Sequence, residues 1–215
     1  MSPSLPIRFL FLAAFLLLGL TACATPQQPP MPVGDLKLGQ AHFTHPTATG
    51  ELLAGYQAED AAPIEEKILG DLDLLFSSLL VSESAHTFTG PEKSLLCEKT
   101  VKAQTQGRQA ALRHWAAVGR CMGVDLLVVP QILEWHEREG PEYAAVAPAA
   151  VIMDIYVIDV QGDSLISRSH YDAMQSALTS NLLELGSFIK RGGKWVQARD
   201  LAREGMAKAV KELGL

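Results

Sequence analysis

The chain has 215 residues, of which 48% are hydrophobic and 20% are charged, and its formal net charge at pH 7 is −6. This composition is typical of a folded globular protein and excludes a wholly disordered chain. The acidic balance also excludes the basic surface that nucleic-acid binding or a polybasic membrane patch requires. We therefore expect no nucleic-acid partner.

The first 22 residues have the features of a secretory signal. Arg8 precedes an uninterrupted apolar run at 9–18, which is too short for a membrane-spanning helix and is followed by small residues. Positions 20–23 read LTAC, which resembles a bacterial lipobox: leucine three residues before a cysteine, with two small residues between. We predict a lipoprotein signal peptide at 1–22 and lipid attachment at Cys23. An ordinary secretory signal with a chance cysteine is the alternative.

Lipid attachment would fix the chain to a membrane, because one acyl chain binds only marginally whereas two or more anchor stably. Residue 24 is Ala rather than Asp, which resembles the default signal for transfer to the outer membrane. We expect the mature chain in the inner leaflet of that membrane, facing the periplasm. Residues 24–34 contain four prolines and no charge, so 23–34 is assigned to the lipidated cysteine and a Pro-rich tether. The tether is either a spacer of roughly 30 Å or a disordered leader of no tuned length.

Residues 35–215 are predicted to form one mixed α/β domain, in which a mixed β-sheet is flanked by helices. Hydrophobic periodicity, together with glycine and proline, places the elements. In the first half these are a weak strand at 36–44, a long loop at 46–63, an amphipathic helix at 64–80, a short strand at 85–89 that Gly90-Pro91 stops, and a helix at 108–122 that ends at Gly123.

The second half of the domain is predicted to contain a strand at 125–135, a hairpin of 149–160 and 165–171, and helices at 178–188 and 195–213. Pro130 cannot donate a ladder hydrogen bond, so we expect a bulge there or a position beside the sheet edge. The strand at 149–160 is apolar on both alternating faces, which predicts a central strand that is covered on both sides.

Besides Cys23 the chain has two cysteines, Cys97 and Cys121. An exported protein meets an oxidising compartment, so this pair is a disulfide candidate, closing a loop of about 25 residues worth roughly 3–4 kcal/mol. The alternative is two unpaired thiols, with Cys121 buried on a helix face. No CxxC or HExxH spacing occurs, and the HxxH at 42–45 cannot close a zinc site alone. We expect no metal and no cofactor.

Two segments carry a resemblance to a known fold family. AVGRCMGVDLLVV at 117–129 is similar to a helix ending in a G-x-D step into a strand, and MDIYVIDVQGDSLI at 153–166 is similar to an apolar hairpin with a glycine turn. With the element order, they resemble the TolB amino-terminal-domain-like fold, which the curli-secretion lipoprotein and the lipoprotein activator of a peptidoglycan synthase share. The resemblance implies binding to other proteins and no catalytic residue. The first strand lacks the Pro-Phe ending common in such domains, and the long amphipathic hairpins of a pore are not present, so no pore is carried over.

The polar sequence SRSHYD at 167–172 is the candidate for chemistry. Alternation along a strand puts Arg168, His170 and Asp172 on one face, with residues 167, 169 and 171 opposite. A catalytic His170 would need a nucleophile within hydrogen-bond reach and an orienting group behind it, and no motif such as GxSxG marks that arrangement. We expect a solvated or hydrogen-bonded hairpin strand without a catalytic residue.

Four side chains near the ends of elements are candidates for partner binding, because tryptophan and arginine are enriched at binding hot spots. They are Trp135, Arg138, Arg191 and Trp195. The two tryptophans could equally complete the core. The sequence thus indicates a non-enzymatic, lipid-anchored periplasmic protein that recruits or regulates an unidentified envelope protein. The alternatives are a subunit of an oligomeric secretion assembly, which would make the chain a homo-oligomer, and an envelope hydrolase that uses His170.

Overall fold

The computed structural model describes residues 35–55, 62–104, 110–141, 146–174 and 195–215. Cys23, the tether, Arg191 and the helix expected at 178–188 lie outside them. The described strands are β1 (Leu38–Gln40), β2 (Phe88–Thr89), β3 (Leu126–His136), β4 (Ala150–Asp159) and β5 (Ser164–Met174). The described helices are the short 3-10 turn η2 (Thr49–Glu51) and α2 (Glu66–Glu83), α3 (Pro91–Gln104), α4 (Ala111–Met122) and α6 (Ala198–Leu213).

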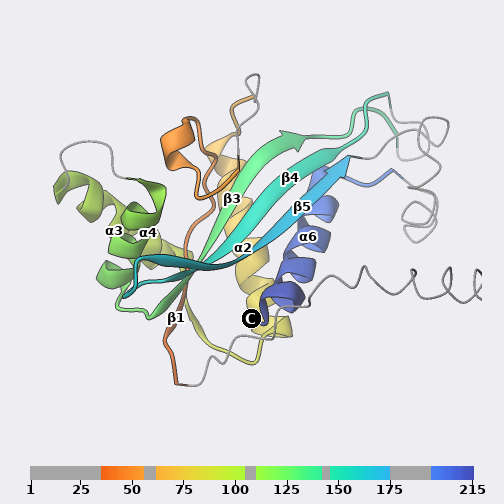
Figure 1. Ribbon diagram of the computed structural model, residues 1–215. Coiled ribbons are helices and arrows are strands. Elements are labelled where there is room, and N and C mark those ends of the chain that lie inside the picture. The colour runs from red at the N-terminus through yellow and green to blue at the C-terminus, as the bar shows by residue number, and fades with distance from the viewer. Residues whose placement is uncertain (1–34, 56–61, 105–109, 142–145, 175–194) are drawn as a thin grey trace, which may run out of the picture.

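The strands form one mixed sheet in the order β2-β1-β3-β4-β5 (Figure 1). β1 is parallel to β2 and to β3, whereas β4 is antiparallel to both of its neighbours. The predicted hairpin is therefore formed by β4 and β5, and β5 ends the sheet on one side. The predicted mixed α/β fold class is confirmed.

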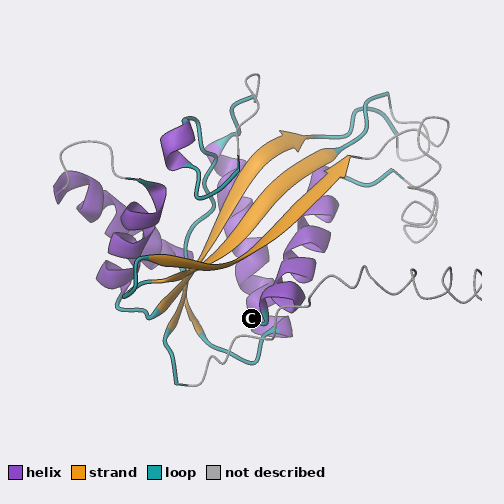
Figure 2. Ribbon diagram, viewed as in Figure 1, coloured by secondary structure: helices purple, strands orange, loops and turns teal. Residues whose placement is uncertain are grey.

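Helices cover both faces of this sheet, and each face has its own hydrophobic core. In Figure 2, α2 and α6 lie behind the sheet, while α3 and α4 lie to its left. Met153, Ile155 and Val157 of β4 belong to the core with α2 and α6, whereas Tyr156 and Ile158 belong to the core with α3 and α4. β4 is thus an internal strand with a hydrophobic core on each side along residues 153–158, in line with the prediction from its apolar faces.

The first strand is shorter than expected, and Pro130 explains where it stops. Along β3, the carbonyl groups of Val128 and Pro130 accept hydrogen bonds from the backbone of Ala41 and Thr44. Pro130 therefore faces the chain that follows β1, and it has no N–H to offer there. Regular pairing ends at Gln40, although the expected strand runs to Thr44. The register of β3 against β4 also shifts between residues 132 and 134, close to the expected bulge.

The backbone that leaves the sheet finds side-chain partners instead. The N–H of Phe43 donates to Asp73 Oδ1 on α2 at 2.7 Å, and the N–H of His42 donates to Ser94 Oγ on α3 at 3.4 Å. Burial raises the pKa of Asp73 to about 6, against the opposing effect of the Phe43 hydrogen bond and the nearby His42. The loss of one ladder donor at Pro130 is thus offset by polar side chains from two helices.

Helix α3 is an element that the sequence analysis missed. Its buried stripe consists of Pro91, Ser94, Cys97 and Val101, while Leu95 and Leu96 are exposed. The most hydrophobic side chains therefore lie on the wrong face for an amphipathic pattern. Gly90-Pro91 was also interpreted only as a strand stop, although proline is favoured in the first turn of a helix.

A disulfide between Cys97 and Cys121 joins α3 to α4, with the two Cα atoms 5.6 Å apart. Cys97 is buried and Cys121 is exposed, so the alternative of a buried, unpaired Cys121 does not describe this structure. Helix α4 ends at Gly123 with φ of 73°, a left-handed conformation that glycine adopts without strain. The C-terminal helix begins at Ala198, three residues later than expected.

Candidate functional site

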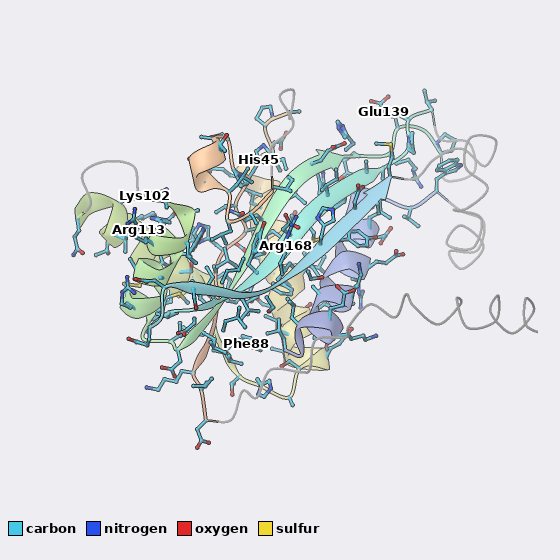
Figure 3. All side chains as sticks on the ribbon, viewed as in Figure 1. His45, Phe88, Lys102, Arg113, Glu139 and Arg168 are labelled. Carbon is cyan, nitrogen blue, oxygen red and sulfur yellow. A yellow bond between two sulfur atoms is a disulfide. The ribbon has the colours of Figure 1, made fainter. Side chains whose placement is uncertain are left out.

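One half of the sheet face that carries the α3–α4 core is not covered by those helices. The covered half contains Leu127, Val129, Tyr156 and Ile158. Strand pairing continues the face into two further rows: Gln131, Asp154 and His170, and then Glu134, Ile152 and Asp172. We call these two rows, with Arg168 beside them, the open face. In Figure 3, Arg168 lies over the sheet, away from Lys102 and Arg113 on the α3–α4 side.

The loop after β1 covers one edge of the open face through hydrogen bonds. Gln131 Nε2 donates to the Glu51 carbonyl at 2.9 Å, and Gln131 Oε1 accepts from the N–H of Leu53 at 3.2 Å. The hydroxyl oxygen of Tyr156 lies 3.2 Å from the Ala54 carbonyl oxygen. This loop lies at the boundary between the α3–α4 core and the open face.

Asp154 is the centre of the open face, and its carboxylate is fully buried. Arg168 donates from Nε to Oδ1 and from Nη2 to Oδ2, each at 2.9 Å. Tyr156 shares Oδ2 at 2.9 Å, and His170 Nδ1 lies 2.8 Å from Oδ1. A buried carboxylate requires this number of partners, because an unpaired buried charge costs several kcal/mol. Asp154 therefore fixes two half-exposed side chains, Arg168 and His170, in one geometry.

The buried carboxylate also changes the titration of its neighbours. Burial raises the pKa of Tyr156, and the adjacent charge of Asp154 raises it further. The hydrogen bonds from Arg168 to Asp154 raise the pKa of that guanidinium. Tyr156 therefore stays a neutral hydrogen-bond donor, and Arg168 stays charged, at any physiological pH.

The structure confirms the predicted alternation of β5. Arg168 and His170 face Asp154, whereas Ser169 donates to Glu212 of α6 at 2.6 Å on the opposite face. Asp154 is the residue of this candidate site that the sequence analysis missed. A charge in the middle of a strand whose neighbouring positions are apolar on both faces was the available signal, since such a charge needs partners on the neighbouring strand.

The open face holds half of a catalytic arrangement. Asp154 stands behind His170 as an orienting carboxylate, which leaves Nε2 of His170 as the nitrogen for proton transfer. Ser167 and Ser169 are on the other face of β5, and the Tyr156 hydroxyl donates to Asp154. Among the described residues of the open face, no serine, threonine or cysteine is placed beside His170 to act as its nucleophile.

A second polar cluster lies between α3, α4 and the segment after β1. His42 contacts Ser94 Oγ through Nδ1 at 3.0 Å and Glu98 through Nε2 at 3.4 Å, and His114 Nε2 lies 3.2 Å from Glu98. Burial opposes ionisation of Glu98, but hydrogen bonds from His114, His42 and Lys102 outweigh it and hold its pKa well below the usual range. Ser94 is fully buried, so this serine–histidine–glutamate chain is closed to a substrate and joins the helices instead.

Three of the four predicted partner-binding residues meet where β3 ends and α6 begins. Trp135 packs against the α2–α6 core and its Nε1 donates to Glu137 at 3.2 Å. Arg138 Nη1 donates to the carbonyl of Trp195. Arg138 is half-buried and ties β3 to the segment before α6, and its part in partner binding stays a prediction. Arg191 lies outside the described residues.

The described residues offer neither a metal site nor a membrane-spanning helix. They contain no group of three or more His, Cys, Asp or Glu arranged to hold a metal ion. His45 of the HxxH motif contacts the Ile132 carbonyl at 2.9 Å, away from the cluster around His42. Across the same ranges, no helix is both long and apolar enough to cross a membrane.

No protein-family model matches the sequence, and comparison with curated proteins finds no match. Three solved structures show partial similarity to this chain. The hypothetical protein CT253 from Chlamydia trachomatis has 15% identity and a TM-score of 0.45, covering 84% of this chain and 98% of that one. The PelC dodecamer from Paraburkholderia phytofirmans has 13% identity and a TM-score of 0.43, covering 86% and 92%. Lipoprotein GNA1162 from Neisseria meningitidis has 14% identity and a TM-score of 0.40, covering 74% and 95%. Likeness at this level assigns neither a family nor a function, and the TolB-like resemblance stays a prediction.

Proposed function

We propose that this chain is a lipid-anchored periplasmic protein that recruits or regulates another envelope protein by binding it at the open face, without catalysing a reaction. The observation that carries the proposal is the fixed polar surface around Asp154. Arg168 and His170 are half-exposed, yet both are held by a carboxylate on a central strand. Binding sites gain precision when rigid elements hold their polar groups in this way.

The composition of the open face favours binding over chemistry. In the outer row, Glu134 and Asp172 flank the half-buried Ile152, so one apolar side chain lies between two charged ones. Protein–protein interfaces commonly mix apolar and polar groups in this way. The location of the protein is also part of the proposal. The lipid anchor at Cys23 and the position at the outer membrane are predicted from the N-terminal sequence alone.

A hydrolase remains the second candidate because of one specific contact. His170 Nδ1 lies 2.8 Å from Asp154 Oδ1, the orientation that a general base requires. A water molecule would have to act as the nucleophile, with His170 accepting its proton at Nε2. The open face then would be an active site, and loss of the imidazole would abolish function.

Two substitutions separate the candidates in a strain that lacks the chromosomal copy. His170→Gln keeps a side chain able to donate to Asp154 but removes the base, so the binding proposal expects most of the complementation of the deletion phenotype to be kept, because Arg168 and the other charged groups of the open face remain. Glu134→Arg reverses a charge on the open face and should impair complementation, because reversed interface charges weaken association. Glu83→Arg, at the exposed end of α2, is the matched control. Loss of function in a folded His170→Gln protein would favour the hydrolase.

A further inference from the structure

The outer edge of β5 carries backbone groups that no described strand uses. β5 ends the sheet and pairs with β4 alone among the described strands. Lys208 Nζ of α6 donates to the carbonyl of His170 at 3.2 Å, which shows that this carbonyl points away from β4. Backbone groups of alternate residues point the same way in an antiparallel strand, so Arg168 and Asp172 present theirs to the same edge.

The sequence of this edge is complementary to itself when reversed. A register shift next to residue 166 ends the regular part of β5, and regular pairing runs from Ser167. In antiparallel pairing centred on His170, Arg168 of one copy lies opposite Asp172 of the other, and the converse pair forms at the same time. All of these side chains are on the open face. Opposite charges directly across two strands stabilise such pairing, and like charges oppose it.

We propose that a second copy of this chain pairs antiparallel with the edge of β5, with the two-fold axis at His170. Arg168 keeps its bonds to Asp154 through Nε and Nη2, and its Nη1 is the group for the partner's carboxylate. The two sheets become continuous, and both open faces lie on the same side of the joined sheet. The inference does not depend on the function proposed for the open face.

Lys208 affects the proposed equilibrium between single chains and paired copies. A lysine that occupies an edge carbonyl competes with strand addition, and such residues are common guards of exposed edges. Lys208 also lies 3.5 Å from Glu212 on its own helix, to which it can return when the carbonyl of His170 is taken by the second copy. Pairing is therefore reversible, and removal of the lysine should strengthen it.

Cysteine crosslinking tests the register in the purified full-length protein under mild oxidation. At the two-fold axis, paired Cα atoms are about 5.5 Å apart, within the range of a disulfide. We expect His170→Cys to form a covalent dimer on non-reducing gels. Asp172→Cys is the matched control, because its two copies would be separated by four residues, about 14 Å along the strand. The parent chain, with its native cysteines, sets the background. Equal crosslinking of Asp172→Cys and His170→Cys would overturn the proposed register.

Sedimentation velocity in detergent provides a second test of dimerisation that requires no substitution at His170. We expect the parent chain to dimerise with rising concentration. Asp172→Arg should raise the dissociation constant about tenfold, because each Arg168 would then lie opposite a new arginine of the other copy. Asp172→Asn should fall between them, and Lys208→Gln should lower the constant. A parent chain that stays monomeric throughout, or a Lys208→Gln variant that dissociates more readily, contradicts the proposal. Association that Asp172→Arg leaves unchanged would assign the edge to another partner.

Discussion

At the residue scale, the polar groups that hold this fold together are buried and paired, and most of them escape sequence analysis. Asp73, Ser94 and Asp154 are all buried. Each lies in a segment whose apolar neighbours dominate the pattern, and each finds its partner on a different element. The partner's identity depends on long-range packing, which one sequence does not encode locally. Only the alternation of Arg168 and His170 was accessible in advance, because strand periodicity alone determines it.

Asp73 gives a pH-dependent prediction. Its pKa is raised to about 6 from an ordinary value of 3.8, so the folded state binds a proton more tightly than the unfolded state. Its contribution to stability is full below about pH 4 and is lost as pH rises through 6. Asp73→Asn keeps an oxygen for the N–H of Phe43 and cannot ionise. As pH rises from 4 to 7, the parent should lose this contribution and the variant should not. The free energy of unfolding of Asp73→Asn relative to the parent should therefore rise by about 2 kcal/mol over this range, as measured by urea denaturation.

The exposed Asp71 on the same helix provides the control for this measurement. Asp71→Asn removes the same formal charge from α2 without removing a buried carboxylate. If both variants follow the parent's pH dependence, burial of Asp73 is not what shapes the stability curve.

At the element scale, segments with regular apolar spacing were predictable from the sequence, whereas helix α3 was not. Helices α2 and α4 and strands β3 and β4 follow from apolar spacing, whereas α3 does not, because serine and cysteine form its buried stripe. The early end of β1 required knowledge of which strand would neighbour Pro130. Sequence periodicity therefore located elements whose buried face is apolar, and it missed features that depend on a polar or cross-strand partner.

Close packing of α6 on the sheet gives a second prediction. A Cβ added at Gly205 would lie 2.6 Å from ring atoms of Tyr171 and 2.7 Å from the end of Met153. Gly205→Ala should lower the free energy of unfolding by about 1–3 kcal/mol, because this overpacking exceeds the gain in helix propensity. Gly70 in α2 is exposed and has nothing within 4 Å of the same position. Gly70→Ala should therefore raise the free energy of unfolding by up to about 1 kcal/mol. Urea unfolding measures both variants, and changes of opposite sign would confirm the close packing at Gly205.

At the scale of the whole molecule, the N-terminal sequence and the described domain play separate parts. The lipobox-like motif predicts the location of the protein. The open face of the sheet is the surface that we propose for binding a partner at that location. The helices α2 and α6 cover one face of the sheet, and α3 and α4 cover only part of the other face. How far each pair extends is a consequence of packing, so the open face was not predictable from the sequence even though most of its residues were.

Anchoring is tested by Cys23→Ser. Because the thiol is the site of acylation, we expect this variant to remain an uncleaved precursor or to appear in the soluble fraction. Fractionation of cell envelopes with an antibody against the folded domain provides the measurement. Normal processing together with an unchanged membrane fraction would remove the basis for the lipid anchor.

The central claim is that the open face is a binding surface, and site-specific photocrosslinking in intact envelopes tests it most directly. A photoreactive amino acid at Glu134 samples this face away from the β5 edge, and the same amino acid at Leu74 samples exposed α2 on the opposite side of the molecule. If the open face binds a partner, position 134 yields a discrete adduct with another envelope protein and position 74 yields none. An adduct from position 74, or from both positions with equal yield, would contradict binding at the open face.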